Sequence, residues 1–250
     1  MLLFVTLLLA TSALGVPSRY ALRGWNQQHG SRVINGVDAV EGEFPYQVSL
    51  RAYPTIHHCG GSIIFDNAIL SAAHCFTSMT PGLVYVGTTR IDDKEATSHR
   101  AMNIIIHENF DFARLHNDVA IVRTEQRIMF TRKVYPIALQ TTDIKEGVDC
   151  VLSGWGNTLH GVPNNLQRVN LRTVSNEECQ RNHQNEIIES QICTTTYYNT
   201  GACNGDSGGP LAANGVQIGI VSWGIPCAVG YPDVFTRVSA HLKWIERYMY

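Results

Sequence analysis

The chain has 250 residues, of which 44% are hydrophobic and 16% are charged, and its formal net charge at pH 7 is -2. This length and composition suit a globular protein with a large core and exclude a mainly disordered chain. The mildly acidic balance, without a run of basic residues, argues against nucleic acid or an anionic membrane surface as a principal partner.

The chain begins with an apolar run, MLLFVTLLLATSALG, that ends in the small residues of Ala13-Leu14-Gly15. This pattern predicts a secretory signal peptide over residues 1–15. A membrane anchor is the alternative, but the run is shorter than the roughly 20 residues needed to span a bilayer. No later stretch of the sequence is long and apolar enough to cross a membrane. We therefore predict a secreted, extracellular protein without a membrane partner.

Residues 16–32 are polar and lack a hydrophobic period, which predicts a loose leader segment. These first 32 residues carry three Arg and no acidic residue, so their removal would bring the net charge to about -5. After Arg32 the sequence becomes a succession of short β-rich runs separated by Gly, Pro, Asn and Asp, as in a β-sandwich or barrel. The runs are FPYQVSL, GGSIIF, NAILSAAH, GLVYVG, AMNIIIH, DVAIVRT, DCVLSGWG, VQIGIVSWG and DVFTRV.

The segment near 140–148 carries QTTDIKEG, a connector between two β units of similar size. No alternation of strands and helices is visible, and only the tail has a clear helical period. There, apolar residues recur at i, i+4, i+7 and i+11, with Ser239 available as an N-cap. The four apolar residues are Val238, Leu242, Ile245 and Met249.

Seven cysteines are present, and in an exported protein most of them are expected to form disulfides. The absence of any Cys-x-x-Cys pair argues against a structural zinc site. An odd count leaves at least one thiol unpaired. The cysteines are Cys59, Cys75, Cys150, Cys179, Cys193, Cys203 and Cys227.

Three segments carry residues suited to acyl transfer. GDSGGP places Ser207 among glycines, which let backbone N–H groups converge beside the hydroxyl, but a serine is a poor nucleophile without a base. SAAHC places His74 at the end of an apolar strand, and HNDVAIV places Asp118 at the start of another. Taken singly, each has an ordinary interpretation: a turn serine, a packed core histidine and a turn aspartate.

Together these segments, in the order His, Asp, Ser, resemble the chymotrypsin/trypsin family of serine endopeptidases over residues 33–250. The resemblance implies an all-β fold of two packed six-stranded antiparallel β-barrels with a C-terminal helix, with the boundary between barrels near 140–148. It implies that Ser207 attacks the scissile carbonyl, that His74 relays the proton, and that Asp118 orients and stabilises the imidazole.

The resemblance extends to the surroundings of these three residues. It implies that the N–H groups of Gly205 and Ser207 form the oxyanion hole, and that Ser222 supports the buried aspartate. Two interpretations of His57 remain open: a role in the precursor or a purely structural role. No cofactor is implied. Calcium is not expected, because VGTTRIDDKE lacks the acid at the position of the family's first calcium ligand.

The sequence SR followed by VING resembles the family's activation site. It implies a propeptide over residues 16–32, removed after Arg32 by a trypsin-like protease, and a protease domain over residues 33–250. The freed amino group of Val33 would pair with Asp206 and order the oxyanion loop. A surface turn is the alternative position for Asp206.

The family's disulfides correspond to the pairs Cys59–Cys75, Cys179–Cys193 and Cys203–Cys227. Cys150 has no partner, because Ala213 stands where many relatives carry the second cysteine. We expect Cys150 to be a buried free thiol, and an intermolecular disulfide is the alternative.

The resemblance also locates a substrate pocket. Gly201 matches its floor, where trypsin-like relatives carry an Asp that binds Lys or Arg, and Gly224 matches a wall that admits long side chains. Asp233 replaces a usual Gly across the floor, an arrangement similar to broad-specificity arthropod digestive proteases, including those termed serine collagenases or brachyurins. Asp233 either faces substrate or only binds backbone. Leu115 is expected to shape the adjacent subsite and Trp223 to support the substrate backbone.

We therefore predict a secreted, zymogen-activated serine endopeptidase of broad or chymotrypsin-like specificity, cutting after large apolar residues with tolerance for Lys and Arg. A digestive role is favoured. The expected partners of this monomer are protein or peptide substrates, an activating protease and protein inhibitors. The alternatives are a regulatory protease of saliva or immunity, and a non-catalytic homologue that acts as a binding protein.

Overall fold

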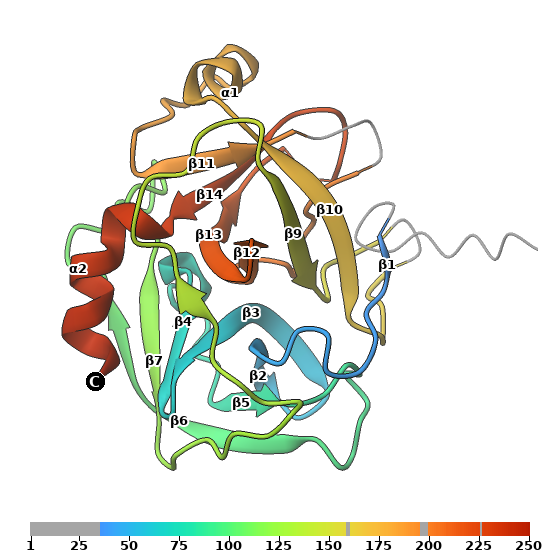
Figure 1. The fold of residues 1–250 in the computed structure, drawn as a ribbon. Helices are drawn as coiled ribbons and strands as arrows, with labels where there is room; N and C mark the ends of the chain where they lie inside the picture. The colour runs from blue at the N-terminus through green and yellow to red at the C-terminus, as the bar shows by residue number, and fades with distance from the viewer. Residues whose placement is uncertain (1–35, 159–160, 196–199, 226) are drawn as a thin grey trace, which may run out of the picture.

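The computed structural model describes residues 36–250 except 159–160, 196–199 and 226. The predicted signal peptide, the leader and the Arg32–Val33 junction lie outside the described residues. Strands dominate the described chain, and twelve of them form two closed six-stranded antiparallel barrels (Figure 1). The predicted fold class is confirmed.

The first barrel closes in the order β2-β3-β4-β7-β6-β5. Its strands are β2 (Gln47–Tyr53), β3 (Ile56–Phe65), β4 (Ala68–Ser71), β5 (Leu83–Val86), β6 (Thr97–Ile106) and β7 (Ala120–Thr124). Most residues of β4 and β7 are buried, because these strands cross the densest part of the apolar core. A 3₁₀ turn, η1 (Ala73–Phe76), follows β4.

The second barrel closes in the order β9-β10-β11-β14-β13-β12. Its strands are β9 (Asp149–Gly154), β10 (Gln167–Val174), β11 (Gln191–Thr194), β12 (Pro210–Ala213), β13 (Val216–Trp223) and β14 (Asp233–Arg237). Two short strands lie beside it: β1 (Val37–Asp38) pairs with β10, and β8 (Ala138–Leu139) pairs in parallel with β13. The connector predicted near 140–148 runs from β8 to β9.

The C-terminal helix α2 (Val238–Met249) leaves the second barrel at β14 but packs on the core of the first (Figure 1). Val238, Trp244 and Ile245 belong to that core, which explains the apolar period of the tail. The expected cap at Ser239 is wrong: the N-cap is Arg237, without a side-chain cap hydrogen bond. No helix in the described part of the chain is long and apolar enough to span a membrane.

A second helix, α1 (Asn176–Asn182), was not expected from the hydrophobic period, because it has only seven residues and buries only Cys179. Its signal is local. Ser175 accepts a hydrogen bond from the Glu178 N–H at 3.1 Å, and two acidic residues occupy the first turn.

Two reciprocal pairs of polar side chains join the barrels. Ser62 Oγ of the first barrel donates to Gln217 Oε1 of the second at 2.6 Å, and Ser153 Oγ of the second donates to Gln47 Oε1 of the first at 2.6 Å. All four residues are at most 2% exposed. Because these buried oxygens have donors, the interface can be polar without a large desolvation cost.

Candidate active site

His74 and Asp118 meet in the first barrel. His74 Nδ1 donates to Asp118 Oδ2 at 2.7 Å, and the His74 backbone N–H donates to Oδ1 at 2.9 Å. Asp118 is fully buried, while the His74 side chain remains 20% exposed. Because a carboxylate only accepts, Nδ1 carries the proton, and in the neutral ring Nε2 is left with its lone pair. The arrangement therefore leaves Nε2 of a partly exposed ring able to accept a proton.

The second barrel also holds Asp118. Ser222 Oγ on β13 donates to Asp118 Oδ2 at 2.6 Å, and Thr236 Oγ1 on β14 donates to the Asp118 carbonyl oxygen at 2.8 Å. The carboxylate thus accepts three hydrogen bonds, which offset the cost of burying its charge. The aspartate is fixed from both barrels.

The glycines around Ser207 are required by its backbone. Gly205 has φ 101° and Gly208 has φ 76°, and both values favour glycine. A Cβ on Gly208 would collide with Ser71 Oγ and lie 2.7 Å from the Gly60 carbonyl oxygen. The Gly60 N–H also donates to the Ser207 carbonyl oxygen at 2.7 Å. The serine segment is therefore packed against the end of β4, three residues before His74.

Asp206, beside the serine, is fully buried. Its carboxylate accepts from the Gly156 N–H at 2.8 Å and the Cys203 N–H at 3.0 Å, and a Cβ on Gly154 or Gly156 would collide with it. Burial raises the pKa of Asp206 to about 6. No cation pairs with it within the described residues, so this site favours a neutral acid or the arrival of a positive charge.

His57 lies against the same segment. Its Nε2 donates to the Gly205 carbonyl oxygen at 2.8 Å, and its Nδ1 accepts from Ser49 Oγ at 2.8 Å. Burial lowers the pKa of His57 to about 4, so the ring is neutral at physiological pH. Of the two interpretations of His57, this geometry directly supports a structural one: a neutral ring that anchors the segment before Ser207.

A cavity of about 140 Å³ opens beside Ser207. Trp223, Gly224 and Asp233 line it, as do Ala202 and Asn204, whereas Gly201 and Leu115 do not. Gly201 is buried directly before Ala202, and Leu115 lies in the loop that precedes Asp118. A groove of about 760 Å³ lies elsewhere, around Arg237 and the start of α2, and includes none of the residues predicted for catalysis or for the substrate pocket.

Asp233 is 4% exposed, and its Oδ2 accepts from the Ala202 N–H at 2.7 Å. The other oxygen, Oδ1, would lie 3.0 Å from a Cβ on Gly224, so it faces the glycine wall of the cavity. Burial, and to a smaller extent the charge of Asp206, raises the pKa of Asp233 to about 7. The acid therefore both binds backbone and lines the cavity.

One contact at this cavity was not expected from sequence. The His183 ring packs edge-on against Trp223, with centroids 4.9 Å apart, and its Nε2 donates to the Pro232 carbonyl oxygen at 2.7 Å. His183 stands alone in a polar stretch, so nothing in the local pattern indicates a role. It fixes the wall of the cavity next to Asp233.

Three disulfides surround the site: Cys59–Cys75, Cys179–Cys193 and Cys203–Cys227. These are the pairs that the sequence resemblance implies. The first joins β3 to η1, which carries His74, and the third ties the serine segment to the far wall of the cavity. Cys59, His74 and Cys75 lie close enough to hold a metal ion, but the two sulfurs are bonded to each other and offer no thiolate.

The remaining cysteine, Cys150, is a buried free thiol. Burial raises its pKa to about 12, which disfavours the thiolate, the form that attacks as a nucleophile or binds a metal. The alternative of an intermolecular disulfide is disfavoured by this burial.

Comparisons with known proteins agree with this geometry. The sequence model of the family described as trypsin matches residues 33–245. Chymotrypsin-2 of Vespa crabro is 45% identical, over 86% of this chain and 99% of its own length. Trypsin II-P29 of Gallus gallus is 38% identical, over 86% of this chain and 88% of its own. The solved structure of neuropsin, a serine protease of mouse brain, superposes with a TM-score of 0.81 at 27% identity, covering 86% of this chain and 99% of that one.

Proposed function

Because this chain belongs to the trypsin family of serine endopeptidases, we propose that Ser207 is its nucleophile and His74 its general base. The observation that carries this proposal is the 2.7 Å hydrogen bond from His74 Nδ1 to the buried Asp118, which leaves Nε2 as the proton acceptor. The glycine packing of the Ser207 segment against the end of β4 supports the same assignment.

In the proposed reaction, Ser207 Oγ attacks the carbonyl carbon of the scissile bond while its proton passes to His74 Nε2. Asp118 stabilises the resulting imidazolium. The N–H groups of Gly205 and Ser207 are assigned to the developing oxyanion, and each such donor lowers the barrier by about 3–4 kcal/mol. The imidazolium then protonates the leaving amine, and a water molecule repeats the sequence on the acyl-enzyme.

For activation, we propose that the chain is secreted as a precursor and cut after Arg32, and that the new amino group of Val33 pairs with Asp206. Support comes from Asp206, which is a fully buried acid with two backbone donors in the described structure. A cation would lower the cost of ionising it. An Arg32→Gln precursor should resist trypsin at residue 32 and stay inactive, and normal processing there would contradict the scheme.

For specificity, we propose cleavage after large apolar residues with tolerance for Lys and Arg. Gly224 keeps the cavity open, and Asp233 lines it with an acid that can meet a basic side chain. A digestive role remains the favoured biological setting, and a regulatory protease is the alternative. Partners would be protein substrates, an activating protease and protein inhibitors.

A cleavage profile of the trypsin-activated, repurified protein on a peptide library tests this proposal, with Ser207→Ala as the control for residual trypsin. Cleavage after Phe, Tyr, Leu and Arg, with Arg lost in Asp233→Gly, supports a mixed pocket in which Asp233 meets substrate. The same profile in both proteins makes Asp233 a backbone-binding residue only. Turnover by Ser207→Ala, or failure of an organophosphonate to label processed protein, would overturn the proposed nucleophile.

A further inference from the structure

The loop of residues 107–117, which leads into Asp118, ends in an unusual conformation. Asn117 has φ 54°, a left-handed value that costs a non-glycine residue about 1 kcal/mol or more. Its side chain is held, because Asn117 Nδ2 donates to the Asn109 carbonyl oxygen at 2.9 Å. Because Asn117 immediately precedes Asp118, its conformation sets the direction in which the aspartate leaves the loop.

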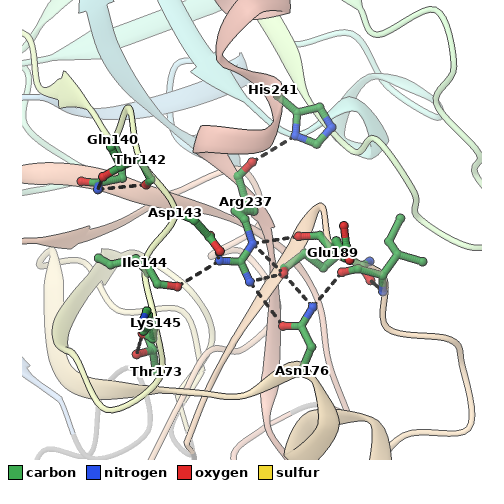
Figure 2. A network of polar contacts seen from close by, with 12 residues as sticks. Gln140, Thr142, Asp143, Ile144, Lys145, Thr173, Asn176, Glu189, Arg237 and His241 are labelled. Atoms are coloured by element: carbon green, nitrogen blue, oxygen red, sulfur yellow. Dashed lines mark hydrogen bonds and ion pairs between the residues drawn. The ribbon is translucent and has the colours of Figure 1, made fainter.

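The helix α2 contacts Asn117 through a buried histidine. His241 is 4% exposed, and its Nε2 lies 3.2 Å from Asn117 Oδ1. Its other nitrogen, Nδ1, lies 3.0 Å from the Arg237 carbonyl oxygen, one turn back (Figure 2). The ring therefore bridges the start of α2 and the residue before Asp118.

The start of α2 is itself firmly anchored. The Arg237 guanidinium donates to Asp143 and to the carbonyl oxygens of Ile144, Glu189 and Gln191 (Figure 2). These partners come from the connector between the barrels, from the turn before β11 and from the first residue of β11. The carbonyl oxygen that His241 contacts therefore belongs to a residue whose side chain is held by several hydrogen bonds.

The hydrogen-bond partners of His241 restrict its protonation. Both nitrogens face acceptors, since the Asn117 amide nitrogen is used by Asn109; turning the amide around would set its oxygen against the Asn109 carbonyl oxygen. Only an imidazolium can donate to both acceptors, whereas a neutral ring loses one hydrogen bond.

Burial is the main influence on the ring, and it lowers the pKa of His241 below the ordinary value for histidine. The neighbouring His107, whose ring centroid is 5.5 Å away, also lowers this pKa, while the hydrogen bond to the Arg237 carbonyl and the charge of Asp118 partly oppose the shift. Glu108 faces the next turn of α2 rather than His241, because it accepts from Trp244 Nε1 at 2.7 Å. The lowered pKa favours the neutral ring near pH 7, and its Nε2–H tautomer donates to Asn117.

We propose that His241 is a positioning residue for catalysis: it holds Asn117 in its left-handed conformation and so fixes Asp118 against His74. The proposal rests on the catalytic roles proposed above for His74 and Asp118. It makes the C-terminal helix, which contributes no group to the reaction, part of what sets the turnover rate.

The test compares the activated wild type with His241→Leu and His241→Gln. We expect His241→Leu to lower kcat about tenfold, because small displacements of catalytic groups are costly, with little change in KM. His241→Gln, which can still donate to Asn117, should recover most of the rate.

The matched control is Trp244→Phe, which removes a different hydrogen bond from the same helix to the same loop. It should lower the melting temperature while leaving kcat close to the wild-type value. In an Asn117→Gly background, where glycine adopts the left-handed conformation freely, His241→Leu should have no further effect on kcat.

Unchanged kcat in folded His241→Leu, no recovery of the rate in His241→Gln, or equal effects of His241→Leu with and without Asn117→Gly would each overturn the proposal. Ser207→Ala, measured alongside, distinguishes a failure of the positioning role of His241 from a failure of the proposed catalytic roles. If that variant is inactive while His241→Leu behaves as wild type, the positioning role alone is wrong. If Ser207→Ala still turns over substrate, the proposed catalytic roles fail first.

Discussion

Among single residues, Asp233 is the one through which electrostatics would act on substrate choice in the proposed pocket. It is a buried acid on the wall of the cavity beside Ser207, and burial raises its pKa to about 7. Below that pH the carboxyl is mostly neutral and the cavity is suited to an apolar side chain. Above it the carboxylate is ionised and can pair with Lys or Arg.

We therefore predict that cleavage after Arg, relative to cleavage after Phe, increases as pH rises from 6 to 8. Paired peptide substrates that differ only at the residue before the scissile bond measure this ratio, in which the titration of shared catalytic groups cancels. In Asp233→Asn, which cannot ionise, the ratio should not change with pH. A wild-type ratio that is also constant would mean that Asp233 does not meet substrate.

At the scale of elements, the two helices differ in how they begin. In α1, Ser175 caps the first turn, whereas in α2 the nearby Ser239 does not cap. We predict that Ser175→Ala lowers the free energy of unfolding by about 1 kcal/mol. That loss corresponds to about 2–4 °C in melting temperature for a protein of this size. Thermal unfolding in an inactive Ser207→Ala background checks it, with Ser239→Ala as a matched control that should be near neutral. An equal loss in both variants would refute the assignment of the cap.

The pairing of β9 with β12 sets up a second prediction. Val151 is opposite Ala212, which makes Cys150 and Ala213 the next pair in the antiparallel register. Such pairs have Cα separations of about 4.5–5.5 Å, within the range of a disulfide. Ala213→Cys should therefore form a disulfide with Cys150 and raise stability by up to about 4 kcal/mol. Loss of free thiol under denaturing conditions measures bond formation, and Ala213→Cys with Cys150→Ala should show no stabilisation.

The elements differ in how far the sequence predicts them. Apolar runs such as DVAIVRT, which contains β7, identify most strands, because nearly every residue of such a strand is buried. The strand β10 is not predicted from the sequence. Its residues alternate between buried and less buried positions, but the less buried positions carry Asn and Arg, so no continuous apolar run marks the strand. The helix α1 was missed for the opposite reason: its signal is a cap and charges, with almost no apolar face.

The site was predictable where short motifs carry the chemistry. The segments around His74, Asp118 and Ser207 identified these residues only in combination, because each segment alone has an ordinary interpretation. Contacts between distant parts of the chain could not be predicted in this way. The support of Trp223 by His183, and the contact of His241 with Asn117, depend on how the barrels and helix pack.

For the whole molecule, the association of the two barrels is the decisive feature, because His74 and Asp118 come from one barrel and Ser207 from the other. The reciprocal pairs Ser62–Gln217 and Ser153–Gln47 lie at this interface, fully buried. Removal of either serine hydroxyl leaves a buried amide oxygen without a donor.

Ser62→Ala and Ser153→Ala should each lower the free energy of unfolding by about 1–3 kcal/mol. Denaturant unfolding in the Ser207→Ala background measures the loss, and Ser98→Ala, on an exposed position of β6, is the matched control. A loss no larger than that of the control would mean that the interface is not held by these hydrogen bonds.

The short strand β14 has a consequence for the evolution and engineering of this enzyme. It begins at Asp233 on the pocket wall, binds the Asp118 backbone through Thr236, and continues at Arg237 into α2. With the roles proposed for Asp233 and Asp118, selectivity and rate would depend on one continuous piece of chain, so a change in one is expected to affect the other. Libraries built at the pocket wall should be selected for turnover as well as for substrate preference, and new preferences should first arise together with a slower enzyme.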